Sequence, residues 1–149
     1  MSATHEARRN APAQVASARV KRAASEGVAT NASASADCGM SFIDLKQLPF
    51  VGMSYEFVGE TQGAPFSAYI VKAKPGQGPP LHKHPYVEVA FTLEGCATIT
   101  VGDEQREVKA GGIAVIPVNT PHRFVNSGDT ILRQIDVHAS PRFIQTNLT

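Results

Sequence analysis

The sequence predicts an all-β fold, and two observations support this prediction. From residue 42 onward the chain consists of short apolar stretches of strand length, interrupted by turns at regular intervals. No segment shows convincing helical periodicity, in which apolar residues would recur every three or four positions. Regularly spaced short strands are typical of β-sandwiches and small barrels. The pattern alone leaves these two architectures open.

Turn signals separate the expected strands. Ala64-Pro65 precedes the first strand, and the three prolines and two glycines of residues 75–80 form a loop after it. Gly102-Asp103 and residues 126–129 are expected to form tight turns. The predicted strands are residues 66–73, 87–93, 97–101, 105–109, 113–116, 123–126 and 130–137.

Residues 1–39 differ in composition from the rest of the chain. They contain twelve alanines and no Ile, Leu, Phe or Tyr. A segment without large apolar side chains cannot offset the entropy lost on ordering, so we expect it to be disordered. We interpret it either as a targeting segment of the organellar type or as an extension from a misassigned start. Residues 40–149 are expected to form one globular domain.

Composition excludes several classes of partner. The formal net charge is +1, which does not fit a nucleic-acid-binding surface. The longest apolar runs, such as residues 113–116, are far shorter than the ~20 residues of a membrane span. Cys38 and Cys96 are too few for a disulfide framework. We therefore expect a cytoplasmic protein without nucleic-acid or membrane partners, with organellar import through residues 1–39 as the weaker alternative.

Three of the five histidines belong to one candidate constellation with a glutamate. His82 and His84 are two positions apart, and in an extended segment they point to the same side, about 7 Å apart. Pro85 interrupts the strand, so the chain can fold back and bring the carboxylate of Glu88 to the same place. His122 arrives later in the chain as a fourth ligand.

The residues around this constellation form two spaced motifs. In the first, five residues separate Gly76 from His82-x-His84, three more precede Glu88, and six more precede Gly95. In the second, five residues separate Gly111 from Pro117-x-Asn119, two more precede His122, and three more precede Asn126. In this order they resemble the two conserved-barrel motifs of the cupin superfamily, in its small single-domain, cupin 2 type.

The second motif departs from the family at Asn119, where glycine is usual. Asparagine tolerates the left-handed backbone region better than other non-glycine residues, so we expect the turn before His122 to form. The resemblance covers about residues 45–140. It implies a double-stranded β-helix, the jelly-roll barrel of the cupins, with a disordered extension before it.

The resemblance assigns four metal ligands, His82, His84, Glu88 and His122. Three neutral imidazoles and one carboxylate suit Fe, Mn, Co, Ni, Cu or Zn and disfavour Ca²⁺ and Mg²⁺, which prefer oxygen ligands. We therefore expect one divalent transition metal per chain. Four protein ligands on an octahedral ion leave two open positions, as in a catalytic site.

Alternation along the strands identifies candidate pocket residues. Ala90 and Thr92 share the side of Glu88, while Phe124 and Asn126 share the side of His122. On the last strand, one face carries Gln134, Asp136 and His138, the other carries Ile131, Arg133, Ile135 and Val137, and either face can point inward. A histidine at a strand end is more often a solvated surface residue than an acid–base group. Tyr86 is similarly expected to be a packed turn aromatic rather than a donor to substrate.

The resemblance implies a metal-dependent enzyme that acts on a small molecule. Oxidation of the dioxygenase type is favoured, with Glu88 as a catalytic proton acceptor as well as a ligand. A metal-dependent isomerase, cyclase or lyase is one alternative, and a non-catalytic small-ligand binder is another. A homodimer is also expected, because small cupins commonly pair and residues 66–73 carry aliphatic surface that suggests a covered edge or face.

Overall fold

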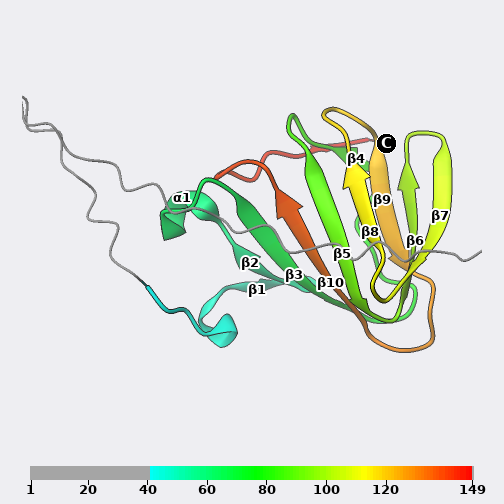
Figure 1. Cartoon of the computed structure of the whole chain (residues 1–149), viewed down its shortest axis with the longest axis horizontal. Coiled ribbons are helices and arrows are strands. Elements are labelled where there is room, and N and C mark those ends of the chain that lie inside the picture. Colours follow the sequence, from blue (N-terminus) through cyan, green and yellow to red (C-terminus); the bar gives the residue numbers. More distant parts are fainter. Residues whose placement is uncertain (1–40, 149) are drawn as a thin grey trace, which may run out of the picture. The chain divides into compact units, whose positions relative to one another are not determined.

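The computed structural model describes residues 41–148, which form two antiparallel β-sheets (Figure 1). This part of the chain contains eleven strands, one four-residue α-helix and one turn of 3₁₀ helix. The all-β prediction and the double-stranded β-helix are both confirmed. The expectations for residues 1–39 lie outside the described residues.

The larger sheet has six strands and carries β10 at its centre. Its order is β1 (Phe50–Val51), β2 (Ser54–Phe57), β3 (Ser67–Ala73), β10 (Leu132–His138), β5 (Glu88–Glu94) and β8 (Ile113–Ile116). β10 pairs with β3 on one side and with β5 on the other, so strands from the two ends of the domain lie side by side (Figure 1). β3 lies between β2 and β10 and is therefore not an edge strand. The suggestion that residues 66–73 form a sheet edge is wrong.

The smaller sheet has five strands and closes the barrel. Its order is β11 (Thr146–Asn147), β4 (His82–Lys83), β9 (His122–Asn126), β6 (Cys96–Val101) and β7 (Glu104–Lys109). Both β4 and β11 are only two residues long. β4 agrees with the extended segment expected at His82 and His84, whereas β11 is too short to leave a periodic signal in the sequence.

One hydrophobic core joins the two sheets. Val71 of β3 and Leu132 of β10 contribute from the larger sheet, while Ile99 of β6 and Phe124 of β9 contribute from the smaller one. Leu132 is fully buried, and burying a side chain of this kind stabilises the fold by about 2 kcal/mol.

The inward face of β10 is largely polar. Leu132, Gln134, Asp136 and His138 are all buried, while Ile135 and Val137 on the opposite face are half-buried. His138 is only 4% exposed, so the expectation of a solvated surface histidine is wrong. The structure thus decides which face of the last strand points inward.

The predicted turns have the expected backbone conformation. Asn119 has a φ of 58° and is the one non-glycine residue with positive φ among residues 41–148. Gly95 and Gly111 have φ of 83° and 88°. The prediction that asparagine replaces glycine in the turn before His122 is confirmed.

Two helical segments lie outside the predicted pattern, namely η1 (Leu45–Gln47) and α1 (Gly59–Gln62). Both are too short to show helical periodicity in the sequence. No helix between residues 41 and 148 is long and apolar enough to cross a membrane.

Candidate metal centre

The four predicted ligands converge at one end of the barrel. His82 begins β4, His122 begins β9 and Glu88 begins β5, so each stands where a strand starts. His82 and His122 are direct partners across the β4–β9 pair. One potential ligand atom from each of the four residues lies within 4.8 Å of all the others. The fold-back at Pro85 therefore occurs, and it brings Glu88 into the other sheet beside the histidines.

All four side chains are withdrawn from water. His82, His84, Glu88 and His122 are between 1% and 6% exposed. Burying a carboxylate and several imidazoles is costly unless charges are balanced and hydrogen bonds are made. The cluster therefore needs a specific set of partners.

Backbone carbonyls fix the tautomers of the three histidines. Nδ1 of His82 lies 2.7 Å from the oxygen of Pro80, Nδ1 of His84 lies 2.7 Å from that of Ile144, and Nδ1 of His122 lies 2.8 Å from that of Thr120. A carbonyl oxygen only accepts hydrogen bonds, so each Nδ1 carries a proton. Each Nε2 is then free to face the cluster as a lone pair, which is the usual arrangement of metal-binding histidines.

The lone pairs of the cluster require a cation between them. Oε2 of Glu88 lies 2.9 Å from Nε2 of His122 and 3.2 Å from Nε2 of His84. The 3.2 Å separation lacks hydrogen-bond geometry, and Nε2 of His84 is the one buried side-chain nitrogen or oxygen among the described residues with no hydrogen-bond partner. The residues therefore fit a divalent transition metal, and the three histidines and Glu88 form a metal-binding cluster.

Without a metal, a proton between Nε2 of His122 and Oε2 of Glu88, 2.9 Å apart, can take the place of the cation. Burial raises the pKa of Glu88, but the hydrogen bond with His122 and the nearby imidazoles of His84 and His138 outweigh the effect of burial and hold that pKa below its usual value. Burial lowers the pKa of His122, but the Glu88 and Thr120 hydrogen bonds outweigh it and raise that pKa above 6.5. Burial lowers the pKa of His82. His122 and Glu88 thus share a proton that a metal would have to displace.

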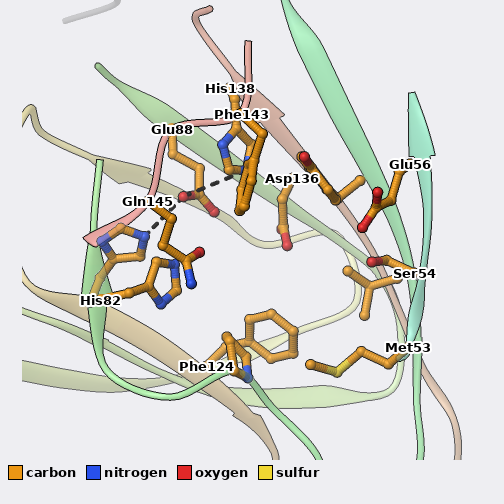
Figure 2. A pocket seen from close by; sticks show the side chains of 14 residues that line it. Met53, Ser54, Glu56, His82, Glu88, Phe124, Asp136, His138, Phe143 and Gln145 are labelled. Carbon is orange, nitrogen blue, oxygen red and sulfur yellow. Dashed lines mark hydrogen bonds and ion pairs between the residues drawn. The ribbon is translucent and has the colours of Figure 1, made fainter. Parts of the chain in front are cut away.

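A cavity of about 160 Å³ adjoins the cluster. Figure 2 shows His82 and Glu88 on one side of it, and Met53 together with Ser54 and Glu56 of β2 on the other. A ligand in the cavity would therefore lie between the metal-binding residues and the wall formed by β2.

A family model described as a cupin domain matches residues 69–138. These residues run from β3 to the end of β10 and include the whole cluster. The chain contains a cupin domain. The motif resemblance, the two-sheet barrel and the family match agree on this conclusion.

Comparison with curated proteins gives one relative of this cupin. An uncharacterized protein of Methanocaldococcus jannaschii is 42% identical over 55 residues, which are 36% of this chain and 43% of the relative. The match thus spans less than half of the relative's length. It carries no description of activity.

Solved structures similar to this cupin include oxalate-converting enzymes. Oxalate decarboxylase of Lactobacillus farciminis, in a formate complex, superposes with a TM-score of 0.62 and 24% identity over 69% of this chain and 34% of its own. A recombinant oxalate oxidase in complex with glycolate superposes with a TM-score of 0.64 and 20% identity over 75% of this chain and 66% of its own. At these identities the likeness shows the fold, and the cupin spans only about a third of the decarboxylase chain.

Only one of the four predicted pocket residues lines the cavity. Phe124 does so, as expected. Ala90 belongs to the hydrophobic core, Thr92 donates to Oε1 of Gln134 at 3.4 Å, and Asn126 donates to the backbone oxygen of Ala73 at 2.9 Å. The prediction that Ala90, Thr92 and Asn126 line the pocket is wrong. Alternation along a strand tells which face of the sheet a side chain occupies, but it does not tell how far along the barrel axis that side chain lies from the metal ligands.

The ring of Tyr86 packs against His84, as expected, and its hydroxyl both donates and accepts hydrogen bonds. Its ring stacks on that of His84, with centroids 5.1 Å apart and an interplanar angle of 5°. The hydroxyl donates to the oxygen of Ile144 at 3.1 Å and accepts from its N–H at 3.0 Å. Nδ1 of His138 lies 3.3 Å from the same hydroxyl, and burial lowers the pKa of His138 to about 4. Tyr86 therefore anchors residues 143–148, here called the C-terminal segment, beside the cluster.

The sequence pattern missed much of the cavity wall. The missed residues include Met53 just before β2, Ser54 and Glu56 of β2, Asp136 of β10, and Phe143 and Gln145 of the C-terminal segment. β2 is four residues long and the C-terminal segment lies outside the two motifs. No local signal marks either as part of the site, because only the barrel brings them there. For Asp136, alternation along the last strand placed it on the same face as Gln134 and His138, but it did not tell whether that face points inward.

Proposed function

We propose that this cupin is a metal-dependent enzyme that acts on a small molecule, and that its reaction is an oxidation of the dioxygenase type. The observation that supports this most is the buried cluster with three oriented Nε2 lone pairs beside a cavity. A four-ligand set leaves positions on a six-coordinate ion for water, substrate or dioxygen. A structural site, by contrast, is closed by its protein ligands.

His82, His84, Glu88 and His122 would hold one divalent ion of Fe, Mn, Ni, Co, Cu or Zn. When bound, such an ion supplies Lewis acidity and, for a redox-active metal, one-electron chemistry. The protein's own contribution is to orient the ligands, to place the substrate and to limit the access of water. The similarity in fold to oxalate oxidase supports oxidoreductase chemistry as a proposal.

Glu88 is proposed to accept a proton from the substrate in addition to holding the ion. Its Oε2 faces the histidines, whereas Oε1 makes no hydrogen bond or ion pair among the described residues. Glu88 also lines the cavity, so the second oxygen lies within reach of a bound molecule. A carboxylate so placed can serve as a general base.

The direct test is metal content followed by oxygen uptake. Protein purified without added metal is analysed for bound transition metals, and oxygen consumption is then measured against a panel of diols, thiols and flavonols. The proposal requires one metal per chain and oxygen uptake that depends on both metal and substrate. Metal-free protein that also fails to take up any of the six ions would overturn it.

A metal-dependent isomerase or lyase is the second candidate, and Asp136 favours it. This acid lines the cavity and is only 5% exposed, so a second carboxyl group besides Glu88 faces a bound molecule. Proton relocation on a carbonyl compound uses such a pair of acid and base. Turnover of a substrate at an unchanged rate without oxygen would select this candidate over the oxidation.

We also propose that residues 40–149 form the cupin domain and that two copies pair. A protein that starts at Met40 should keep its thermal midpoint, because the preceding residues offer little apolar surface to bury. Pairing is supported by the edge strand β8, where Ile113 and Val115 are 59% and 64% exposed. A monomeric mass in light scattering at micromolar concentration would count against the homodimer.

A further inference from the structure

The cavity beside the cluster contains acids but no basic side chain other than histidine. Glu56 of β2 and Asp136 of β10 line it in addition to the ligand Glu88, and no Lys or Arg is among its described lining residues. Figure 2 shows Glu56 across the cavity from the ligands and Asp136 between the two sides. A carboxylate-bearing molecule in this cavity would meet no cationic side chain apart from the metal site itself.

Asp136 presents one unpaired oxygen to the cavity. Its Oδ1 accepts a hydrogen bond from Nε2 of Gln134 at 2.7 Å, and the described residues give Oδ2 no hydrogen-bond partner. Burial, with a smaller contribution from the charge of Glu88, raises the pKa of Asp136 well above its usual value despite the Gln134 hydrogen bond. The carboxyl therefore takes up a proton more readily than an exposed aspartate, and in its protonated form Oδ2 can donate a hydrogen bond to an oxygen of a bound molecule.

The charges of the site balance without a charged substrate. Three neutral imidazoles and one carboxylate leave a divalent ion with a single net positive charge. The carboxylate of Glu56 on the facing wall offsets that charge. A neutral molecule would keep this balance, whereas a carboxylate anion would add an unpaired negative charge in a half-buried cavity, which is unfavourable.

The remaining walls suit a molecule with both apolar and hydroxyl groups. Tyr69, Val71, Phe124 and Phe143 supply apolar surface, and Ser54 offers a hydroxyl beside Glu56. Oxygens of Glu56 and Ser54 can accept hydrogen bonds from substrate hydroxyls, while Asp136 donates one. The donors and acceptors therefore match an uncharged compound carrying hydroxyl groups.

We propose that the cavity of this cupin selects an uncharged, hydroxyl-bearing small molecule and discriminates against carboxylate anions, with Glu56 as the principal charge filter. This inference rests on the proposed metal-dependent function and narrows its substrate class. It separates the chain from the oxalate-converting enzymes to which it is similar in fold, since oxalate is a dicarboxylate.

The test uses two probes of nearly equal size that differ in charge. Full-length protein is loaded with Co²⁺, and binding of glycolate, an anion, and of glycolamide, its neutral amide, is followed through the visible spectrum of the ion. The affinity ratio of glycolate to glycolamide is divided by the same ratio for Co²⁺ in water, which removes the intrinsic preference of the ion. We expect the corrected ratio to be below one.

Three variants locate the origin of the preference. Glu56→Gln keeps the shape of the side chain and should raise the glycolate affinity about threefold or more, with glycolamide changed by less than about twofold. Glu104→Gln removes an equal charge from an exposed position on β7 and should leave the corrected ratio unchanged. Asp136→Asn replaces one neutral donor by another and should also leave it within about twofold.

The outcomes separate this inference from the proposed function. Protein that binds no Co²⁺ or other candidate ion would refute the metal site itself. Protein that binds Co²⁺ but shows a corrected ratio of one or more, or a ratio that Glu56→Gln does not change, would refute only the charge filter. Failure of both probes to perturb the Co²⁺ spectrum would refute it as well, because the cavity would then not open onto the ion.

Discussion

Nδ1 of His84 lies 2.7 Å from the backbone oxygen of Ile144, although sixty positions separate the two residues in the chain. The most buried histidine of the cluster is thus oriented by the C-terminal segment. Figure 1 shows this segment in red, running from the end of β10 towards β4, where Thr146 and Asn147 pair with Lys83 and His82. The segment therefore holds both histidines of the first motif in place.

Removing residues 143–149 should weaken metal binding by about tenfold or more. The deletion takes away the acceptor that fixes the tautomer of His84 and the pairing of β11 with β4. Loss of such an orienting partner typically costs ten- to a hundredfold in metal affinity. Metal titration of the shortened protein is the measurement, and circular dichroism checks that the barrel persists. Unchanged affinity in a folded protein would show that the segment does not orient His84.

Replacing any of the four ligands by alanine should strongly reduce metal occupancy. Each change in His82, His84, Glu88 or His122 removes one of four bonds to the ion. Elemental analysis after dialysis gives the occupancy of each variant. His138→Gln is the matched control, because Nε2 of His138 lies 3.8 Å from Oε2 of Glu88 but does not belong to the cluster. Full occupancy of the His84 and His122 variants would remove the basis of the assignment.

Glu88→Gln should separate metal binding from turnover. The amide oxygen can still coordinate an ion, though more weakly, while the negative charge and the proton-accepting capacity are lost. We expect partial metal retention and a loss of turnover of about a hundredfold or more, consistent with the removal of a general base. Rates are compared at matched occupancy with any substrate from the oxygen-uptake panel. Equal turnover rates in the Glu88→Gln variant and the unchanged protein would show that Glu88 is only a metal ligand and not a proton acceptor.

Metal affinity should decline with falling pH from a point above pH 6.5. The pKa of His122 is raised above 6.5, so its Nε2 is protonated below that raised value. A metal must displace this proton, and affinity is therefore complete above the raised pKa and falls as pH decreases through it. Metal titrations between pH 5 and 8 measure the pH at which the affinity begins to fall. In the Glu88→Gln variant the onset should move to lower pH, because the charge that raises the pKa is gone. An onset at the same pH in both proteins would contradict the shared proton.

The two sequence motifs predicted the ligands because residues close in the chain determine the geometry of each motif. The two-residue offset of His82 and His84, the break at Pro85 and the turn at Asn119 are set by neighbouring residues. Backbone sterics at these positions determine where each side chain points. Strands of four or more residues were predicted well where they lie between the motifs.

The facing wall could not be predicted because it depends on contacts between distant strands. On β10, the hydrophobic rule favours Ile135 and Val137 as the inward residues, yet Gln134 and Asp136 are the buried ones. Gln134 is tolerated inside because it donates to Asp136 and accepts from Thr92, and Asp136 is tolerated because it also borders the cavity. Alternation along one strand contains no information about such partners.

The three acceptors that fix the histidine tautomers are main-chain oxygens, of Pro80, Thr120 and Ile144. No single amino-acid replacement can delete a carbonyl group, so the orientation of the imidazoles is insensitive to most mutations of the residues that supply it. The cavity walls, by contrast, consist of side chains that mutation can exchange freely. Mutations in the cavity wall can therefore change the ligand specificity of this barrel while the orientation of the metal-binding histidines is retained.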